Sequence, residues 1–555
     1  MTLTFWPSGW RPRDPLVACG ALFAMVLTLV VLGHDGGRIV QMASLAAPLF
    51  AWLLWPVRSA RVHRLRTAAV WLWAMAFAVD GAARAYLLDA YQASPDGAMV
   101  LGAAANTNAR ESFEYLSMHW RSVALWFSVL ALAGVLAGRY AHRGLRRMER
   151  GLHQRPQAPR ARWPRWSVAV LCAVLLTSAI AYANKPSRRL HPLLFWSTWS
   201  NSVQAQRAGW AHLNGLREET MRRAQAAAPA VTQAGPATVM LVIGESINRD
   251  NMALYGYGRA TSPRLMAQQA QLGDQMVVLR NAWSVDASTL PAIGHMMNFG
   301  QAPMERPMHV LALARAAGYK VWWISNQDDV AIEQQHARMA DVTEMVNRTP
   351  GRASVSLDGE IFHSVHEALD DTAPRKLIVV HLMGAHPHYA LRYPAGENPF
   401  DDSLDAVEAG MVKSGRSTWV RETRQEYDAA VLYQDFIVSE LLQMTRTTGP
   451  ANGYRGWMYL SDHGQEVGHS GDHAGHSPST PSGYRIPAIV WRNRQNAPSP
   501  GNVATEPFRA DWAAWTLADL LHLQWAGDLP ERDVLDERYA WKAPKLPFAQ
   551  RSFKD

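Results

Sequence analysis

Hydrophobic positions follow different patterns in the two halves of the chain. The first half contains long apolar runs, each close to the ~20 residues that a helix needs to cross a bilayer. These runs lie at about 15–33, 39–56, 67–90, 121–139 and 167–184. The third run is the weakest because it carries Asp80 and Arg84, and a buried helix is the alternative there. We expect a membrane domain of five transmembrane helices over residues 1–185.

The second half alternates short apolar runs with longer stretches of helical character. Continuous apolar runs of this length are typical of strands that are covered on both faces. Their alternation with helices predicts an α/β domain over residues 236–555, with a mostly parallel sheet between helical layers. The strands are predicted at 238–243, 319–325, 376–382, 456–460 and 487–491, and the helices at 262–271, 306–317, 358–370 and 417–446.

A bridge over residues 186–235 connects the two predicted domains. It is rich in Trp, Ser, Arg and Ala, and a helix is predicted at about 203–227. Trp196, Trp199 and Trp210 would suit a helix that lies on the bilayer surface. A plain amphipathic linker helix explains the segment equally well.

The positive charge is concentrated between the apolar runs. The net charge is +8, and a basic chain can bind nucleic acid. Here, arginine clusters at 58–66 and 139–165 alternate with loops at 34–38 and 91–120 that are nearly free of basic residues, which indicates membrane topology instead. We expect no nucleic-acid partner, a cytoplasmic N-terminus, and everything after residue 185 on the other side of the membrane.

Residues that can bind a metal follow several predicted strands. The two cysteines, Cys19 and Cys172, lie in apolar runs of the first half, so a metal in the second half would need His, Asp, Glu or a hydroxyl. Ligands of parallel α/β folds bind beyond the carboxyl ends of the strands. The residues at these ends are Glu245, His381, His386, Asp462 and His463. Each alone could cap an element or form a core hydrogen bond. Together they suit Zn²⁺ or a similar ion, and predict metal-assisted chemistry at phosphorus or sulfur.

A segment dense in histidine follows the last of these strand ends. It contains His469, Asp472, His473 and His476. For His469 and His476, a mobile surface loop or adventitious metal binding explains the pattern as well as a functional site does.

Two motifs resemble those of the phosphoethanolamine transferases of the alkaline phosphatase/sulfatase superfamily. Val242–Arg249, followed by Leu254–Arg259 and Ser262-Pro263, resembles the first motif of that family, and Tyr459–Gly464 resembles its metal motif. The resemblance covers nearly the whole chain. It implies a multi-pass protein of the bacterial inner membrane, with an alkaline phosphatase/sulfatase-like catalytic domain in the periplasm.

The resemblance also implies a nucleophile. In this family a threonine lies eight residues beyond an asparagine, and Asn281 places Thr289 at that position. Ser288 is the alternative nucleophile. Thr289 could instead be a helix N-cap before Leu290, although both roles are compatible, because a helix N-terminus also favours an anionic phosphoryl group.

Further site residues are carried over from the family. Glu245, Thr289, Asp462 and His463 would bind one Zn²⁺, and Ser246 would support Glu245. The two further family histidines correspond to His386 and His473. They would hold the phosphoryl group or a second ion, and His386 would protonate the leaving alkoxide.

Substrate-binding residues follow from two more similarities. Trp323–Gln327 resembles the branch of the family that acts on the lipopolysaccharide core, so Asn326 and Gln327 are expected to line the pocket. Asn106–Glu111 resembles a substrate motif on the membrane side, in which Thr107 and Glu111 would share one helix face at i, i+4. An ordinary polar turn is the alternative for that segment.

The expected reaction is transfer of phosphoethanolamine from phosphatidylethanolamine to an envelope glycan through a phospho-threonine-type intermediate. The acceptor would be lipopolysaccharide core or lipid A, with a periplasmic glucan as a further possibility. The ten-residue spacing of His463 and His473 and the lack of cysteines in the second half of the chain resemble the core branch. A sulfatase or other hydrolase, a glycerolphosphate transferase and a non-enzymatic envelope scaffold are the alternatives. Ala260–Arg264 does not fit the sulfatase nucleophile motif.

Overall fold

The structure is a computed structural model. It describes residues 13–53, 59–91, 93–107, 109–154, 165–211, 214–299, 308–327, 329–348, 357–449, 452–493, 503–550 and 552–554. The contacts divide the chain into two compact units. One unit comprises Met1–Ala104 and Ser112–Ala205, and the other comprises Ala105–Glu111 and Gln206–Asp555.

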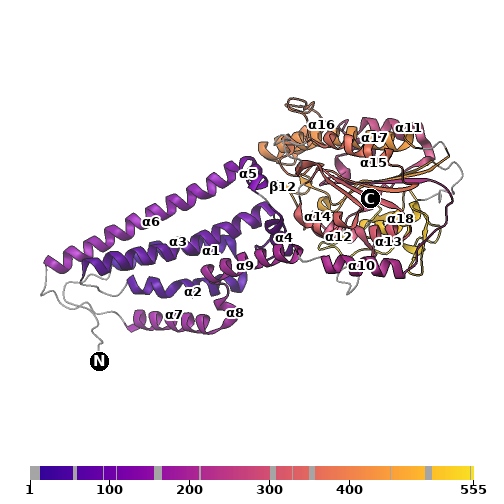
Figure 1. Ribbon diagram of the computed structural model, residues 1–555. Helices are drawn as coiled ribbons and strands as arrows, with labels where there is room; N and C mark the ends of the chain where they lie inside the picture. Colours follow the sequence, from indigo (N-terminus) through magenta and orange to yellow (C-terminus); the bar gives the residue numbers. More distant parts are fainter. Residues whose placement is uncertain are drawn as a thin grey trace. The chain divides into compact units, whose positions relative to one another are not determined.

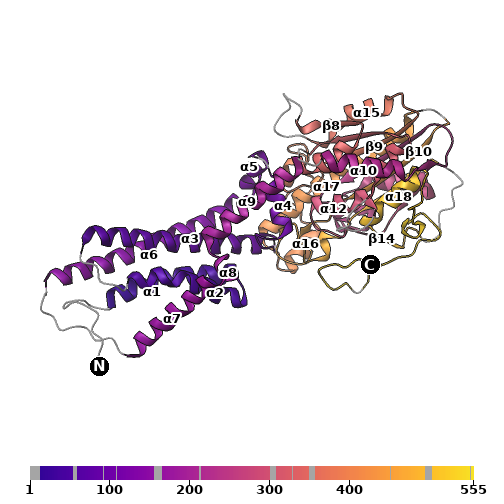
Figure 2. The same ribbon diagram turned by 60° about the horizontal axis from the view of Figure 1, so that its bottom comes forward.

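Long helices form the first unit. The five apolar runs correspond to α1 (Arg13–Gly33), α2 (Gly36–Leu53), α3 (Ala60–Tyr91), α6 (Trp120–Gln154) and α7 (Arg165–Ala183). Helix α1 packs against α2, α3 and α6, and α7 packs against α2 (Figures 1 and 2). The backbones of α1 and α3 approach closely at Gly81, where a Cβ atom would lie 2.5 Å from the carbonyl oxygen of Leu29. The other helices of this part of the chain are α4 (Ala98–Asn106), α5 (Ala109–Met118), α8 (Lys185–Arg188) and α9 (Pro192–Ala211).

Length and apolar composition give a mixed result for membrane crossing. Within the described ranges, no single helix is both long and apolar enough to span a bilayer, whereas Glu111–Met118 and Trp120–Leu136 meet the requirement together, with a bend of 77° between them. The five transmembrane helices therefore remain a prediction.

The two charges that weaken the third apolar run are paired inside the first unit. Asp80 is fully buried in α3, and its carboxylate accepts a hydrogen bond from Arg84 Nε at 3.1 Å and one from Trp196 Nε1 at 2.9 Å. His34 Nε2 lies 3.3 Å from the same carboxylate. Because Asp80 and Arg84 pair with each other and Asp80 has further partners, both charged side chains can be buried in α3.

A seven-stranded sheet forms the centre of the second unit. Its order is β3 (Met276–Val278), β13 (Ala488–Arg492), β10 (Tyr454–Ser461), β2 (Ala237–Gly244), β9 (Arg375–His381), β7 (Lys320–Ser325) and β8 (Val342–Met345). Strands β10, β2, β9, β7 and β8 are parallel, and β13 is antiparallel to both of its neighbours. The mostly parallel α/β sheet is thus confirmed. All five predicted strands are present, and the short edge strands β3 and β8 were not predicted.

Helices cover both faces of this sheet (Figure 1). One layer contains α11 (Pro263–Leu272), α15 (Phe362–Asp370) and α17 (Thr418–Thr447), and the other contains α10 (Asn214–Ala226), α12 (Thr289–Met297), α13 (Val310–Ala316) and α18 (Ala513–Leu520). The second layer shares its core with the sheet, where Val239 and Leu241 of β2 belong to one cluster with Ile293 and Leu517. The remaining elements are α14 (Val330–Gln335), α16 (Ala406–Lys413) and the two-stranded pairs β1 (Ala230–Val231) with β15 (Leu523–Gln524), β4 (Asn281–Trp283) with β14 (Pro507–Arg509), β5 (Asn298–Phe299) with β6 (Met308–His309), and β11 (Glu466–Val467) with β12 (Ala474–Gly475).

Three predicted helices have different limits in the structure. The one predicted at 358–370 begins as the 3-10 helix Asp358–Ile361 and becomes α15 only at Phe362. The helix predicted at 306–317 starts only at Val310, because Met308 and His309 form β6 and pair with β5; residues 306 and 307 lie outside the described residues. The helix predicted at 203–227 starts earlier, since α9 already begins at Pro192; helix is present up to Ala211 and again over Asn214–Ala226, and residues 212 and 213 lie outside the described residues.

Candidate metal centre

Two adjacent parallel strands bring three of the predicted ligands to one edge of the sheet. In the register of β2 and β10, Gly244 is opposite Ser461, so the next residues, Glu245 and Asp462, emerge side by side. The Asp462 N–H donates to the carbonyl oxygen of Gly244 at 3.0 Å and extends the ladder by one step. His463 follows immediately, and all three candidate ligands are fully buried.

The side chains of the four predicted zinc ligands converge. His463 Nε2 lies 3.4 Å from Glu245 Oε1, 3.4 Å from Asp462 Oδ2 and 3.4 Å from Thr289 Oγ1. Thr289 Oγ1 also donates to Glu245 Oε2 at 2.9 Å. One imidazole nitrogen is thus surrounded by three oxygens from three separate segments.

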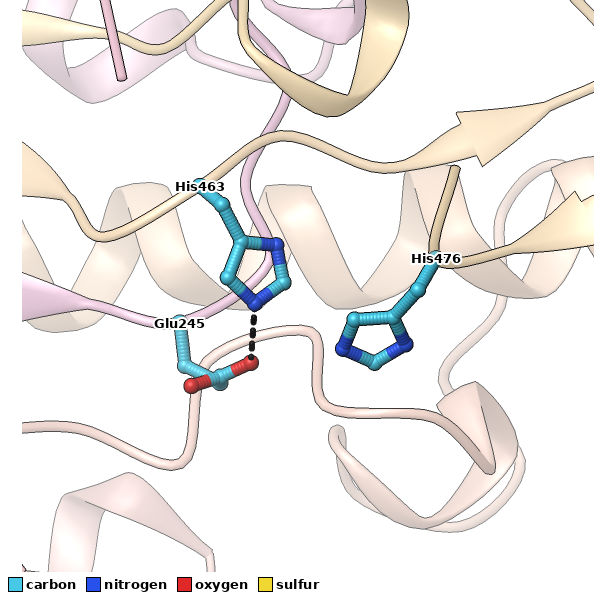
Figure 3. Close-up of side chains that lie close together, drawn as sticks. All are labelled: Glu245, His463 and His476. Carbon is cyan, nitrogen blue, oxygen red and sulfur yellow. Dashed lines mark ion pairs between the residues drawn. The ribbon is translucent and has the colours of Figure 1, made fainter. Parts of the chain in front are cut away.

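A fifth residue, His476, contributes to the same centre. One ligand atom each of Glu245, His463 and His476 lie within 4.8 Å of one another, and the His476 ring faces the other two side chains (Figure 3). Burial lowers the pKa of His476 to about 3. The histidine-dense segment was the sequence signal for this residue, but nothing in it distinguished His476 from His469. His469 Nε2 contacts Asn251 Oδ1 at 2.7 Å instead.

Thr289 is the first residue of α12, and Ser288 is the N-cap. The N-cap role considered for Thr289 therefore belongs to its neighbour, which makes no side-chain capping bond. The hydroxyl of Thr289 is free of that role and points to Glu245 and His463. Its position at the helix N-terminus favours an anionic group on it.

The backbone of Ser246 is strained at this site. Its φ is 59°, in the left-handed region, which costs a non-glycine residue of order 1–3 kcal/mol. In this conformation the Ser246 N–H donates to Asp462 Oδ1 at 3.0 Å, and Ser246 Oγ donates to Glu245 Oε1 at 2.7 Å. The expected support of Glu245 by Ser246 is thus present as a hydrogen bond.

The protonation of the cluster reflects two buried carboxylates beside one imidazole. Burial raises the pKa of Glu245, but the hydrogen bond and charge of His463 outweigh it, and the pKa lies well below its usual range. Burial and the charge of Glu245 raise the pKa of Asp462 well above its usual range. Burial lowers the pKa of His463, but the charges of Asp462 and Glu245 raise it to about 9.

These residues fit a divalent metal. Asp462 Oδ2 is buried and accepts no hydrogen bond from any residue in the described part of the chain, an expensive arrangement for a carboxylate oxygen unless a cation balances it. Two carboxylates, a hydroxyl and imidazoles, without thiolate, are the donor set expected of a catalytic Zn²⁺ site. Glu245, Thr289, Asp462, His463 and His476 are thus the residues that would hold the ion.

The remaining predicted histidines surround the centre. His386 follows β9 and is half-buried, and its charge is among the influences that lower the pKa of Glu245. His473 is also half-buried, and its Nε2 lies 3.4 Å from the carbonyl oxygen of His476. His381 is fully buried behind the edge of the sheet, where its Nδ1 lies 3.2 Å from Ser325 Oγ.

Asn326 and Gln327 directly follow β7 and are buried. Gln327 Nε2 donates to Glu245 Oε2 at 3.4 Å and to the carbonyl oxygen of Leu382 at 2.7 Å. Asn326 Nδ2 donates to Asp358 Oδ1 at 2.9 Å. Their side chains therefore support Glu245 and its surroundings, whereas the sequence had suggested that they line a substrate pocket.

The substrate motif at Asn106–Glu111 is not one continuous helix. Helix α4 ends at Asn106 and α5 begins at Ala109, so the expected i, i+4 helix face of Thr107 and Glu111 is not formed. Arg207 explains the break, because it donates to the carbonyl oxygens of Ala105 at 2.5 Å and Thr107 at 2.8 Å, which a continuing helix would need for its own N–H groups.

Several curated proteins similar to this chain are named phosphoethanolamine transferases. EptC of Escherichia coli strain K12 is 30% identical over 325 residues, which cover 55% of this chain and 54% of EptC. The chain thus spans about half the length of that relative. EptA of Salmonella typhimurium is 24% identical over 462 residues, 78% of each chain.

Solved structures extend the likeness to the fold. The C-terminal periplasmic domain of EptC from Escherichia coli in complex with Zn is 27% identical, with a TM-score of 0.51, and the match covers 57% of this chain and 90% of that domain. The integral membrane protein EptA from Neisseria meningitidis has a TM-score of 0.55 over 92% of this chain and 98% of its own, and at 17% identity it shows the fold alone. A family model described as Sulfatase matches residues 237–523, more than half of the 555 residues. With its mostly parallel sheet and the cluster at its edge, the chain therefore belongs to the sulfatase family.

Proposed function

We propose that this protein is a metal-dependent phosphoethanolamine transferase. It takes phosphoethanolamine from phosphatidylethanolamine and passes it to an envelope glycan, the core or lipid A of lipopolysaccharide. The observation that carries the proposal is the position of Thr289 Oγ1, which lies 2.9 Å from Glu245 Oε2 and 3.4 Å from His463 Nε2. A hydroxyl held among metal ligands at a helix N-terminus is arranged to become a nucleophile.

The reaction has two displacements at phosphorus. A bound Zn²⁺ would lower the pKa of the Thr289 hydroxyl and neutralise charge on the phosphoryl oxygens. Thr289 Oγ forms a bond to phosphorus, and the bond from phosphorus to the diacylglycerol oxygen breaks. His386 gives a proton to that oxygen, and diacylglycerol leaves. An oxygen of a hydroxyl or phosphate of the acceptor sugar then forms a bond to phosphorus, and the bond from phosphorus to Thr289 Oγ breaks. The proton of an acceptor hydroxyl returns to His386; with a phosphate acceptor, the solvent supplies it.

The relatives support both the chemistry and the location. EptC and EptA are named phosphoethanolamine transferases, and a domain of EptC is described in complex with Zn. We place this chain in the bacterial inner membrane, with residues 1–185 crossing it five times from a cytoplasmic N-terminus and residues 236–555 in the periplasm. The arginine clusters between the apolar runs support that orientation.

Covalent labelling tests the proposal. The purified full-length protein, incubated with labelled phosphatidylethanolamine without acceptor, should carry an adduct of about 123 Da on the peptide that contains Thr289, the mass of a phosphoethanolamine group added with loss of water. The Thr289→Ala variant should carry no adduct, and Ser288→Ala is the matched control that keeps it. An adduct that persists in Thr289→Ala but disappears in Ser288→Ala would make Ser288 the nucleophile. No adduct on wild-type protein that contains metal would argue for direct transfer.

A further inference from the structure

Asp358 is a buried carboxylate near the metal centre. Its hydrogen bonds connect four segments: its own, the end of β7, the turn after β9 and α17. Asp358 is the first residue of a short 3-10 helix, Asp358–Ile361, and is only 3% exposed. Oδ1 accepts from Asn326 Nδ2 at 2.9 Å and from the N–H of Met383 at 2.8 Å. Oδ2 accepts from the N–H of Gly384 at 2.9 Å and from Gln434 Nε2 at 2.5 Å. All four partners donate, so both carboxylate oxygens of Asp358 must act as acceptors.

The turn that Asp358 holds lies directly against Glu245. Gly384 has a φ of 54°, and a Cβ atom there would lie 2.7 Å from the backbone nitrogen of Glu245 and closer still to its carbonyl oxygen. The next residue, Ala385, donates its N–H to the Glu245 carbonyl at 2.9 Å. His386 follows. The turn therefore links the position of Asp358 to the backbone of a metal ligand and to a histidine beside the centre.

A second link runs through the neighbouring strand. Asn326 and Gln327 follow β7, and Asn326 is fixed by Asp358 while Gln327 donates to Glu245 Oε2 and to the Leu382 carbonyl. One of these oxygens thus belongs to the segment after β9 that Asp358 holds, and the other belongs to the metal ligand Glu245 itself. Removal of the Asp358 carboxylate would therefore loosen two supports of Glu245. One is Gln327 at the end of β7, and the other is the turn after β9.

We infer that Asp358 is a positioning residue, which holds residues 382–386 and the end of β7 so that Glu245 and His386 keep their places around the metal. The inference rests on the proposed function. This role differs from general stabilisation because the segments that Asp358 holds contact Glu245, a proposed metal ligand. Groups that orient metal ligands from behind typically change metal affinity or activity by about 10- to 100-fold when they are removed.

The test compares two buried carboxylates. Asp358→Asn keeps the size of the side chain but places an NH₂ group where an acceptor is needed. The control is Asp435→Asn, because Asp435 is 1% exposed and accepts the N–H groups of Arg264 at 2.8 Å and Leu265 at 2.9 Å at the start of α11, which contributes no ligand to the centre. We expect Asp358→Asn to weaken zinc binding and slow adduct formation by about 10- to 100-fold. Asp435→Asn should lower the Tm and leave both quantities unchanged.

Gln434→Leu provides a milder variant if Asp358→Asn does not fold. It removes one of the four donors from the α17 side and should weaken zinc binding in the same direction by a smaller factor. Zinc affinity is measured by competition with a chelating dye on the full-length protein in detergent. Unchanged affinity and rate in a folded Asp358→Asn or Gln434→Leu, or equal losses in Asp435→Asn, overturn the inference. Wild-type protein that binds no zinc overturns the proposed metal site, and the role of Asp358 with it.

Discussion

At the scale of single residues, the two carboxylate oxygens of Asp462 have different surroundings, with His463 Nε2 3.4 Å from Oδ2. Its Oδ1 accepts the N–H groups of Ser246 at 3.0 Å and His463 at 2.6 Å, while Oδ2 is buried without a donor from the described residues. One oxygen thus holds the backbone in place and the other remains for the metal.

Asp462→Asn should therefore remove the metal without unfolding the protein. Asn keeps an oxygen for the two backbone N–H groups, but its NH₂ group cannot bind a cation. We expect the zinc content, measured by elemental mass spectrometry after purification, to fall from about one ion per chain to near zero. Asp472→Asn is the control, because Asp472 is exposed and accepts the N–H of Ser417 at 2.7 Å. Full zinc content in Asp462→Asn would contradict the ligand assignment.

His476 and His469 give a second comparison at this scale. Both belong to the histidine-dense segment, but only His476 lies within the ligand cluster, whereas His469 contacts Asn251. His476→Ala should weaken zinc binding by about tenfold or more, since a nearby neutral imidazole is lost. His469→Ala should leave zinc affinity unchanged in the same titration. Equal effects of the two variants would mean that the segment binds metal without a defined geometry.

At the scale of elements, the metal centre depends on how closely the turn after β9 approaches the end of β2. A comparison of two glycines of the second unit distinguishes the cost of a left-handed backbone from the cost of this close contact. Gly384 and Gly256 both have positive φ, 54° and 98°, but a Cβ atom at Gly256 would meet nothing within 4 Å, and one at Gly384 would collide with Glu245.

Gly256→Ala should cost about 1–2 kcal/mol of unfolding free energy, from the left-handed backbone alone. Gly384→Ala should cost roughly 1–3 kcal/mol more, because the new methyl group forces the turn and Glu245 apart. It should also weaken zinc binding, which Gly256→Ala should not. Urea unfolding and zinc titration of both variants are the measurements. Equal stabilities of the two variants would show that the turn yields without moving Glu245.

At the scale of the whole molecule, metal binding should stabilise one of the two compact units. Glu245, Thr289, Asp462, His463 and His476 all lie in the unit that contains Gln206–Asp555. A ligand at 1,000 times its Kd stabilises the folded state by about 4 kcal/mol. For a unit of this size, that corresponds to a rise in Tm of several degrees.

Chelation should therefore shift only one calorimetric transition. Excess chelator should lower the Tm of the unit with the metal centre by roughly 5 °C or more, and added Zn²⁺ should restore it. The transition of the helical unit should remain where it is. Asp462→Asn is the control, since its Tm should not respond to chelator. A wild-type profile that is the same with and without chelator would contradict a zinc-stabilised fold.

Much of the sheet and of the ligand set follows from the sequence for one physical reason. Buried parallel strands are continuous apolar runs, and their carboxyl ends meet at one edge. The runs at β2 and β10 therefore predicted that Glu245, Asp462 and His463 come together, and the structure brings them together. Thr289 was placed by resemblance, because the segment between Asn281 and α12 has no periodic pattern.

Only the tertiary structure decided what surrounds these ligands. His476, Asp358 and the actual partners of Asn326 and Gln327 depend on hydrogen bonds and contacts between segments far apart in the chain, such as Asp358 with Gln434. Irregular turns carry no hydrophobic period, so the sequence does not indicate which of their side chains meet. The central strands and their ends can therefore be predicted from the amino-acid sequence itself, whereas the order of the strands and the packing of turns against them are determined only when the chain is folded.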